Sequence, residues 1–571
     1  MRFAHFPPKL PNNSEVNPAL SSETSALSDG QPQSIAVSAP LTGSYCVALG
    51  LSKPGCTFAR TRLHGLLRQN RTKAIWAEAM WRRALSVLLL PLALAACSGD
   101  DSGPVRVDMI GEPPDLADPS RSPPTPAAEL LLAETAEGLV ALNEEGQIVP
   151  ALARRWIVID DGLSYIFRLD DREWDDGTAL TAGQLARQLH SARRPGSRNR
   201  LARLLGDIDS VNAVTPQILE ITLRRQRVDF LQLLAQPDLA IFIDGGGLGP
   251  FRIADGYDAQ GDSPMLLSPV QPPQGITDES PPPVAPSDTV ELRFVSAATA
   301  VARFSLGQSD LVLGGDWTTL PYTVAIGPSA AQLTLDPVEG LFGLVFVEQT
   351  GFLAVAANRD LLSQAIDRQR IAELFSREEA EPRAVIIAGD AEGLAGVVLP
   401  VWLDEDQSVR ERKARDAVSR WRGANGDIGT LRVALPDAPG SRILFAVVRA
   451  NWAAIGVSVE RVEWRADADL RLIDRVAATD SATWYLDQFA CDRGLPCSEA
   501  FDTAMKAYDE ATSLRVRAIR IAEAATALQA MTPFIPLLRP IRWSLVASRM
   551  TGFQPNRQAS HPFSSLAAPA R

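Results

Sequence analysis

"ETAEGLVALNEEGQIVPALARRWIVIDDGLSYIFRLDDREWDDGTALTAGQL", residues 134–185, alternates short apolar runs with glycine-containing turns. Within it, "WIVID" predicts a strand, and "DDGLSYIFRLD" shows the period-two pattern of a half-buried strand entered through an Asp-Gly turn. The overlapping run "AAELLLAETAEGLVAL" carries leucines at helical spacing, and Thr181 predicts the N-cap of a further helix. The stretch therefore predicts a mixed α/β structure with hairpin strands.

The same alternation continues on both sides of this stretch. "VRVDMI" predicts a strand, and "TVELRFV", "AATAVARFSLG" and "SDLVLGG" predict a strand, a helix and a strand. Later, "TLRVALPD", "RILFAVVRANWAAIG" and "VSVERVEW" repeat this order. The proline-dense segment 269–286 predicts a loop or a connection between domains. We therefore expect two mixed α/β lobes, with a ligand held in the cleft between them.

An export signal lies unusually far into the chain, in "MWRRALSVLLLPLALAACSGD" at residues 80–100. Two arginines precede an apolar run that is too short to span a bilayer, and small residues lead into Cys97. Residues 1–79 are rich in Pro, Ser and Asn without a sustained apolar period, which is poor material for a core. This composition predicts that residues 1–79 are either a disordered extension or the result of a wrongly assigned translation start. Our hypothesis is that translation begins at Met80.

The residues "LAAC" before and including Cys97 resemble the lipobox of bacterial lipoproteins. The resemblance implies that 80–97 contain a lipoprotein signal peptide and that Cys97 becomes the lipidated first residue of the mature protein. Ser98 follows the cysteine, which in enteric lipoproteins favours the outer membrane; a receptor that feeds a permease is expected near the inner membrane. The choice between the two membranes stays open.

Composition narrows the classes of partner. Hydrophobic residues make up 46% of the chain and charged residues 22%, as in ordinary globular proteins. The net charge of −12 argues against nucleic acid or an anionic membrane surface as the main partner, because phosphate binding needs basic patches.

Two cysteines lie six positions apart in "FACDRGLPCSEA". In an oxidising compartment, the short loop between Cys491 and Cys497 predicts a disulfide. A metal site is the alternative, but it would need more thiols than this pair and histidines are scarce, so we expect no metal site.

The sequence lacks the common motifs of enzyme active sites. Of the four histidines, only His190 and His561 follow the export signal, and neither neighbours a nucleophile motif. The sequence has no HExxH, GxSxG or P-loop pattern, and the glycine cluster "DGGGLGPF" lacks dinucleotide-binding spacing. We therefore expect a binding protein without a cofactor and not an enzyme.

Several of these stretches, taken in order, resemble the extracellular solute-binding proteins of family 5, the periplasmic oligopeptide, dipeptide and nickel receptors of ABC importers. "GEPPDLADP" is similar to the family's opening, and the stretch 134–185 is similar to its signature almost throughout. "GLGPFRI", "RFSLGQSDLVLG", "NRDLLSQAIDRQRI", "NWAAIGVSVE" and "PFIPLLRP" resemble later units of the family.

The resemblance implies a bilobal α/β fold of the type II periplasmic binding proteins, with a small extra domain in the N-terminal lobe. On this basis, residues 98–288 form the N-terminal lobe with its inserted small domain. Residues 289–530 form the second lobe, and 531–571 return to the first.

The resemblance also implies a site. In the family a peptide lies between the lobes as an added strand, and a carboxylate of the second lobe receives its α-amino group. The corresponding stretch here is "DLRLIDRVAATDSATWYLDQF", residues 469–489, in which Asp474 and Asp480 are the candidates for this carboxylate. Trp402 and Trp317 are candidates for aromatic cleft walls, with an ordinary core role as the alternative.

The expected protein is thus a monomeric, lipid-anchored periplasmic receptor that binds a small, peptide-like solute and delivers it to an ABC permease. Nickel and haem stay open as solutes. The alternative is a degenerate relative that acts as a lipoprotein adaptor or sensor and holds a partner protein, which the altered stretch 469–489 favours.

Overall fold

The computed structural model describes residues 103–566, apart from 244–245, 255, 258–262, 271–287, 376–379, 388, 390, 395 and 397–398. The expected extension 1–79, the signal peptide 80–97 and the lipidation site Cys97 lie outside the described residues.

The first sheet has seven strands in the order β10-β11-β12-β1-β13-β20-β14. Its centre is a β-α-β unit, because β1 pairs in parallel with both β12 and β13, which are joined by α5 (Ala297–Ser305). The strands are β1 (Val105–Ile110), β10 (Phe251–Ile253), β11 (Met265–Pro269), β12 (Val290–Val295), β13 (Leu311–Asp316), β14 (Leu333–Leu335) and β20 (Arg542–Val546). The predicted strands "VRVDMI", "TVELRFV" and "SDLVLGG" and the helix between the last two are confirmed.

A small domain, residues 140–243, is inserted between β1 and β10. Its antiparallel sheet has the order β4-β5-β7-β6, and α3 (Ala182–Arg193) packs on it. The predicted period-two pattern is present in β5, where Tyr165, Phe167 and Leu169 are buried. Thr181 is the N-cap of α3, and its N–H donates to Gln184 Oε1 at 2.8 Å. The strands are β2 (Val140–Leu142), β3 (Ile148–Pro150), β4 (Ala153–Ile159), β5 (Ser164–Leu169), β6 (Ile208–Thr215), β7 (Ile218–Leu223) and β8 (Phe242–Ile243), which pairs with β9 (Gly246–Gly247).

Two further helices belong to this half of the protein. The helix α2 (Pro126–Thr135) precedes the small domain, and α4 (Phe230–Leu234) follows β7. The predicted helix "AAELLLAETAEGLVAL" is only half right, because α2 ends at Thr135 and "VAL" forms β2. Gly138 lies between them, and a Cβ there would stand 3.0 Å from the Leu234 carbonyl oxygen, so this close passage suits glycine.

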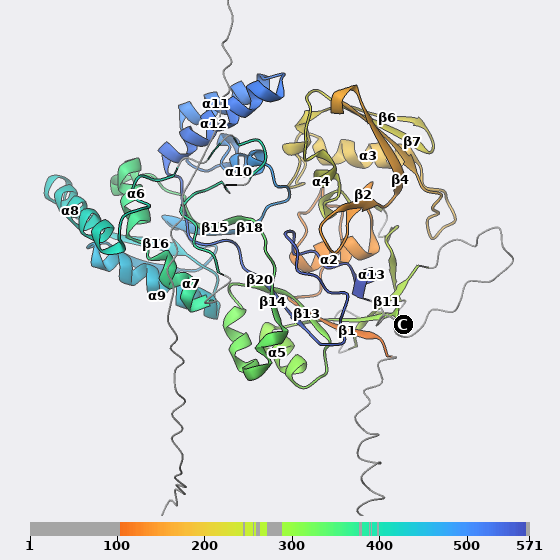
Figure 1. Ribbon diagram of the computed structural model, residues 1–571, viewed down its shortest axis with the longest axis horizontal. Helices are drawn as coiled ribbons and strands as arrows, with labels where there is room; N and C mark the ends of the chain where they lie inside the picture. Colours follow the sequence, from red (N-terminus) through yellow and green to blue (C-terminus); the bar gives the residue numbers. More distant parts are fainter. Residues whose placement is uncertain are drawn as a thin grey trace, which may run out of the picture. The chain divides into compact units, whose positions relative to one another are not determined.

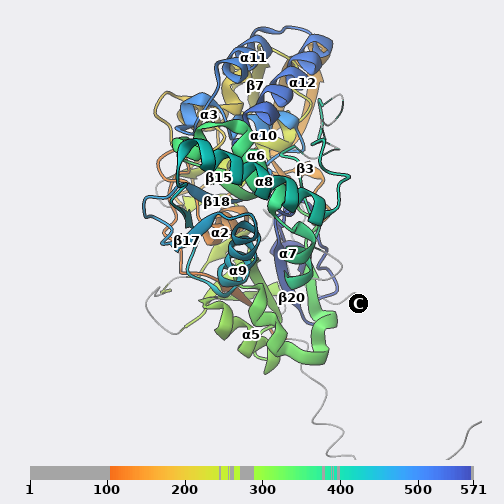
Figure 2. The same ribbon diagram turned by 90° about the vertical axis from the view of Figure 1, so that its left-hand side faces the viewer.

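The second sheet has the order β17-β16-β18-β15-β19. The strands β16 and β17 are parallel and are joined by α9, which confirms the predicted strand-helix-strand unit. Its strands are β15 (Gly340–Phe346), β16 (Thr430–Ala434), β17 (Ser458–Val462), β18 (Leu470–Val476) and β19 (Phe534–Pro536). Its helices are α6 (Ala356–Ala365), α7 (Arg368–Phe375), α8 (Gln407–Asn425), α9 (Pro439–Ala454), α10 (Ala482–Asp487), α11 (Glu499–Glu510) and α12 (Leu514–Met531); Figures 1 and 2 show them around this sheet.

The chain crosses between the two sheets twice. Residues 336–339 lead from β14 to β15, and residues 537–541 lead back from β19 to β20. The two connections run side by side: the Asp336 N–H donates to the Arg542 carbonyl at 3.0 Å, and Arg539 Nε donates to the Val338 carbonyl at 3.1 Å. We call the parts before 336 and after 541 the first lobe and the part between them the second lobe.

These crossings correct the expected lobe boundaries. The second lobe was expected to begin at 289, but β12, β13 and β14 all belong to the first sheet. The return was expected from 531, yet β19 still lies in the second sheet. The proline-dense segment 269–286 follows directly on β11 and precedes β12, two paired strands of one sheet, so it does not mark the passage between lobes.

Three large hydrophobic clusters form the cores. One lies within the first lobe, around β1 and α2, and a second lies mainly around the second sheet and α9. The third includes residues of the small domain together with residues of α10, α11 and α12, so it extends across the two lobes. In Figure 1, the small domain (yellow) and these helices (blue) lie at the same end of the structure.

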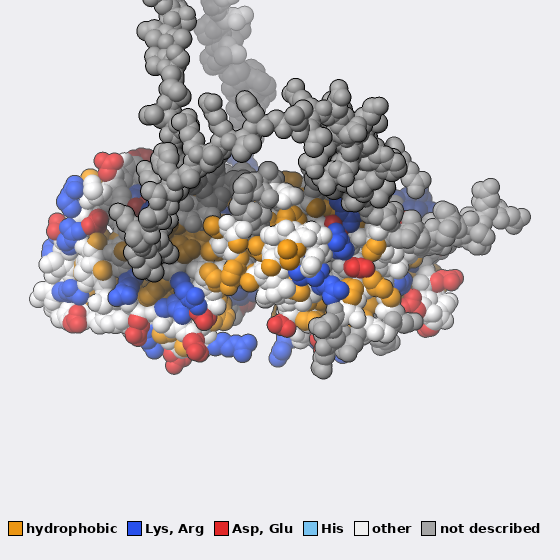
Figure 3. Space-filling model, turned by 90° about the horizontal axis from the view of Figure 1, so that it is seen from below, with side chains coloured by type: hydrophobic (Ala, Val, Ile, Leu, Met, Phe, Trp, Pro, Cys, Tyr) orange, Lys and Arg blue, Asp and Glu red, His pale blue; other side chains and the backbone are white. Residues whose placement is uncertain are grey.

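The surface is mixed. On the face seen in Figure 3, hydrophobic side chains are interspersed with basic and acidic ones. Scattered exposed apolar residues such as Leu306 and Val324 are normal for a folded protein. In the described part of the chain, no helix is both long enough and apolar enough to cross a bilayer.

Candidate functional site

An ion pair joins the two lobes where β18 and β20 meet. Arg542 Nη1 lies 3.0 Å from both carboxylate oxygens of Asp474, and the two side chains are 22% and 13% exposed. Burial raises the pKa of Asp474 to about 6, although the charge of Arg542 acts in the opposite direction. Asp474, a predicted site residue, is therefore already paired with a cation of its own chain.

Trp317, another predicted site residue, follows β13 and is fully buried. Its ring packs against Phe342 and Phe375, at centroid distances of 5.1 Å and 6.1 Å. A hydrogen bond from Trp317 also helps to lower the pKa of Asp474 against the larger effect of burial. The structure thus brings Asp474 and Trp317 together, but the tryptophan is a core residue and does not form an open cleft wall.

Trp402 is likewise placed in the core. It precedes α8, is buried, and its Nε1 donates to Asp360 at 3.0 Å. The guanidinium groups of Arg368 and Arg410 each lie 5.4 Å from its ring centroid. All these partners belong to the second lobe, so the prediction of a cleft wall at Trp402 does not agree with the structure.

Asp480 connects the second lobe to the small domain. Its Oδ2 accepts a hydrogen bond from Gln232 Nε2 at 3.0 Å, and its own N–H donates to Gln232 Oε1 at 3.2 Å. Its Oδ1 lies 3.4 Å from Arg557. Like Asp474, Asp480 has a cationic partner in the chain, so the geometry does not present either carboxylate as an unpaired receiver for a ligand amine.

Arg200 and Glu129, two side chains of the first lobe, form a further ion pair that is electrostatically coupled to Arg542. Arg200 Nη1 lies 2.6 Å from Glu129 Oε1 of α2, and its Nη2 lies 2.7 Å from Asp238. The side chains of Arg200 and Glu129 are 46% and 33% exposed. Burial nevertheless raises the pKa of Glu129, which Arg542 also influences.

Arg475 belongs to the second lobe. It follows Asp474 on β18, its side chain is exposed, and Nη1 donates to Gln488 Oε1 at 2.5 Å. Burial lowers its pKa, and the positive charges of Arg493 and Arg200 lower it further. We call Glu129, Arg200, Asp474, Arg475 and Arg542 the interlobe charge cluster. Since Asp487 also acts on Arg475, the cluster borders a second network.

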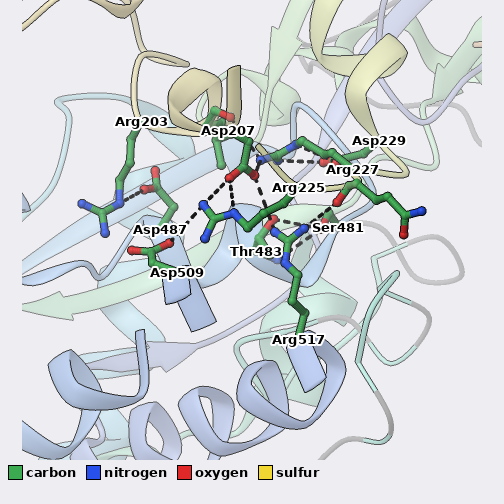
Figure 4. A network of polar contacts seen from close by, with 12 residues as sticks. Arg203, Asp207, Arg225, Arg227, Asp229, Ser481, Thr483, Asp487, Asp509 and Arg517 are labelled. Carbon is green, nitrogen blue, oxygen red and sulfur yellow. Dashed lines mark hydrogen bonds and ion pairs between the residues drawn. The ribbon is translucent and has the colours of Figure 1, made fainter. Parts of the chain in front are cut away.

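That second network joins the small domain to α10, α11 and α12 (Figure 4). Asp207, which is buried, accepts a hydrogen bond from Arg225 Nε at 2.8 Å and one from Arg227 Nη1 at 3.3 Å. Arg517 of α12 reaches it from the second lobe, with Nη2 3.5 Å from Oδ2. Arg517 also donates to the Gln226 carbonyl.

Three more ion pairs join the small domain to the second lobe beside Asp207. Arg203 of the small domain lies 2.6 Å from Asp487 and 2.8 Å from Asp492, and Arg225 lies 3.8 Å from Asp509. We call these contacts, together with those of Asp207, the Asp207 network. Sequence reasoning missed it and also missed Arg475 and Arg542. For Arg475 and Arg542, the available signal was the occurrence of arginines inside the otherwise mostly apolar strands "LRLIDRV" and "IRWSLV".

The described cavities are small. One of about 20 Å³ lies between α12 and residues 385–387, 394 and 396, and another of about 10 Å³ lies beside β15 and β19. Each has room for about one water molecule. The interlobe charge cluster, and not an apolar cavity, is therefore the feature of this conformation that suggests a ligand site.

The structure joins Cys491 and Cys497 in a disulfide, with their Cα atoms 5.3 Å apart, in the loop between α10 and α11. Among the described residues, no three histidine, cysteine or acidic side chains are grouped so as to hold a metal ion.

The fold is also found in solved structures. It superposes on the murein tripeptide binding protein of Escherichia coli with a TM-score of 0.68 and 17% identity, over 82% of this chain and 99% of that one. The structure is therefore a periplasmic-binding-protein fold with two α/β lobes and a small extra domain, as the sequence predicted.

Sequence comparison shows which protein family one part of the chain resembles. Residues 147–268 match the family "Bacterial extracellular solute-binding proteins, family 5 Middle". A probable deoxycholate-binding periplasmic protein of Escherichia coli (strain K12) is 33% identical over 144 residues, which cover 22% of this chain and 27% of that protein. A glutathione-binding protein of Escherichia coli O1:K1 / APEC is 29% identical over 132 residues, 23% of this chain and 26% of that protein.

The matched segment thus spans about a quarter of the length of these curated relatives. The family match 147–268 covers most of the predicted signature stretch 134–185 and most of the small domain. The description of the matched family is that of extracellular proteins that bind solutes.

Proposed function

We propose that this chain is a periplasmic solute-binding protein that captures a small, peptide-like solute between its lobes and delivers it to an ABC importer. The observation that carries the proposal is the interlobe charge cluster, because it consists of charged, partly exposed side chains that come from both lobes. The names of three similar proteins mention deoxycholate, glutathione and a murein tripeptide as their ligands. All three ligands are small solutes with polar or charged groups.

The two crossings provide the means of closure. Residues 336–339 and 537–541 are the covalent connections between the lobes, and they lie side by side. A rotation about these connections would move the two lobes apart, and a bound solute would favour the closed state by contacting both lobes.

The membrane attachment is a further part of the proposal. In this view the signal peptide 80–97 directs export, lipid on Cys97 anchors the mature protein, and translation begins at Met80. The support is the sequence around Cys97 alone. Mass spectrometry of the mature protein would test it: a lipidated N-terminal Cys97 is expected, and abundant peptides from 1–79 would contradict it.

A thermal-shift screen tests the receptor function. The soluble form beginning at Ser98 would be heated with trialanine, glutathione, deoxycholate, a nickel–histidine complex or haem. A ligand that binds only the folded state stabilises it by about 2.7 kcal/mol at a hundredfold excess over its dissociation constant. A raised melting temperature with one probe class is expected, whereas no shift from folded protein with any probe would contradict the proposal.

One observation favours a second candidate, an adaptor that holds a partner protein. The hydrophobic cluster shared by the small domain and α10–α12, together with the Asp207 network, opposes separation of the lobes. Small-angle scattering distinguishes the candidates. A receptor should become more compact when its solute is added, whereas an adaptor with fixed lobes should keep one radius of gyration under all these conditions.

A further inference from the structure

The strand β4 is an edge of the sheet in the small domain. The order of this sheet is β4-β5-β7-β6, and among the described residues β4 pairs with β5 alone. The second half of the strand is apolar and exposed, since Ile157, Val158 and Ile159 are 56%, 45% and 41% exposed. An exposed apolar edge strand offers a row of N–H and C=O groups with which another chain can pair.

The usual protection of an edge strand is weak in β4. Proteins protect such edges with lysine, proline or β-bulges. The strand "ARRWIVI" contains neither lysine nor proline, and its one irregularity lies at its start, between Ala153 and Arg155. The opposite edge, β6, has two irregularities, and its exposed residues are mostly polar or small. The sheet therefore has one edge that is suited to pairing.

Charged side chains lie at both ends of β4. Arg154 and Arg155 stand near its start, and Asp160 and Asp161 follow its last residue. All four residues are exposed. Within the described part of the chain, no group forms a hydrogen bond or an ion pair with any of these four side chains. Two positive and two negative charges are thus available to a partner.

The stretch "RRWIVIDD", residues 154–161, is complementary to itself when two copies run antiparallel. A two-fold axis then relates the copies, and both use the same surface. Opposed side chains of an antiparallel pair share one face of the sheet, so Ile157 or Val158 must lie on the axis. In either register, the arginine end of each strand lies beside the aspartate end of the other, and the apolar residues face each other.

We infer that a second copy of this chain binds to β4, so that two small domains join into one continuous antiparallel sheet. The protein is then a dimer in place of the expected monomer. A strand of another protein would fit the backbone of the edge equally well, but the order of charges along β4 favours the chain itself. The inference goes beyond the proposed function, because β4 lies in the small domain and not at the connections between the lobes.

Sedimentation velocity at low ionic strength tests the association. The protein beginning at Ser98, which contains every described element, should shift from monomer to dimer as its concentration rises. Added salt should weaken the dimer, because exposed charges are screened. Ile157→Lys should weaken self-association at least tenfold, since lysine on an edge strand opposes pairing. Val214→Lys, at an exposed position of β6, is the matched control and should leave self-association unchanged.

Two results of this experiment would overturn the inference. One is a wild type that stays monomeric at every concentration. The other is an undiminished dimer of folded Ile157→Lys, which would place the contact elsewhere on the molecule.

Charge reversals test whether the partner is an antiparallel second copy. Arg155→Glu puts like charges together at both ends of a homodimer, and so does Asp161→Lys. Each variant alone should therefore self-associate at least tenfold more weakly than the wild type. An equal mixture of the two brings opposite charges together at both ends and should regain the affinity of the wild type. If both variants melt as the wild type does and their mixture associates no better than either alone, the inference is wrong.

Discussion

Arg542 on β20 and Asp474 on β18 form an ion pair between the two sheets, with Arg542 Nη1 3.0 Å from each carboxylate oxygen. The chain enters the first sheet at Arg542, immediately after the connection 537–541. The pair therefore lies beside the connections between the lobes, where a rotation of the lobes about these connections displaces atoms least. We therefore expect the ion pair to persist in both the open and the closed state. A contact that a bound ligand must replace would be expected farther from the connections.

Replacement of Arg542 by methionine tests this assignment. It would leave Asp474 buried without its cation, and removing one partner of a buried pair costs about 3–5 kcal/mol. Because burial already raises the pKa of Asp474 to about 6, loss of the arginine would raise it further and let the carboxyl become protonated. Urea denaturation should therefore show about 3 kcal/mol of destabilisation at pH 8 and a smaller loss at pH 5.

The control for this experiment is Arg420→Met on the exposed face of α8, which should change the free energy of unfolding by less than about 0.5 kcal/mol. A loss from Arg542→Met that is equal at pH 5 and pH 8 would show that the side chain stabilises by packing and not by its charge.

Asp207→Asn tests the network between the small domain and α12. Asp207 contacts Arg225, Arg227 and Arg517, so its neutralisation leaves three arginines without this carboxylate. We expect a loss of about 3–5 kcal/mol in the free energy of unfolding. Hydrogen exchange followed by mass spectrometry should also show faster exchange in α12.

Asp209→Asn provides the comparison two residues away. Asp209 pairs with Arg224 at 3.4 Å, and both side chains are 59% exposed. An exposed pair of this kind contributes at most about 1 kcal/mol. Equal effects of the Asp207 and Asp209 substitutions would refute the structural role of the buried network.

Local patterns accounted for most of the fold. The strand β5 was predictable because period two places alternate side chains on one buried face, and α3 because Thr181 precedes an apolar helical repeat. The fold class followed from the order of such elements and from the similarity of the stretch 134–185 to family 5. The lobe boundary did not follow, because both sheets are built from the same kind of β-α-β unit and the change of sheet has no local signal.

The candidate site was harder to predict for a physical reason. Asp474 was identified as a ligand contact from its place in the stretch 469–489, but its partner Arg542 lies 68 positions away. Pairing of charges depends on tertiary proximity, which spacing along one chain does not give. The burial of Trp317 and Trp402 could not be derived either, since an aromatic residue in a loop fits a core and a cleft wall equally well.

The raised pKa of Glu134 leads to a prediction of how the free energy of unfolding depends on pH. It lies in α2, is buried, and accepts a hydrogen bond from the Phe563 N–H at 2.9 Å. Burial raises its pKa to about 8 and raises that of Glu137 to about 7. The folded state therefore retains protons that the unfolded chain releases near its ordinary pKa of 4.5. Stability should fall as the pH rises from about 4.5 to about 8, by about 1.4 kcal/mol per pH unit for each proton.

Glu134→Gln removes one of these titrations. Its free energy of unfolding should exceed that of the wild type at pH 9 and approach it at pH 5. Chemical denaturation at both pH values checks this expectation, with Glu145→Gln, an exposed site, as the control. An unchanged pH dependence in Glu134→Gln would mean that this carboxyl is ionised in the folded protein.

The disulfide between Cys491 and Cys497 closes a short loop that also carries Asp492, a partner of Arg203 in the Asp207 network. Serine at both positions should lower the free energy of unfolding by about 2 kcal/mol, because a short loop constrains the unfolded chain only modestly. Thermal denaturation with and without dithiothreitol checks this value. The reductant should lower the melting temperature of the wild type to that of the double variant and leave the variant unchanged. A wild type that is insensitive to reductant would show either that the bond is absent in solution or that it contributes nothing to stability.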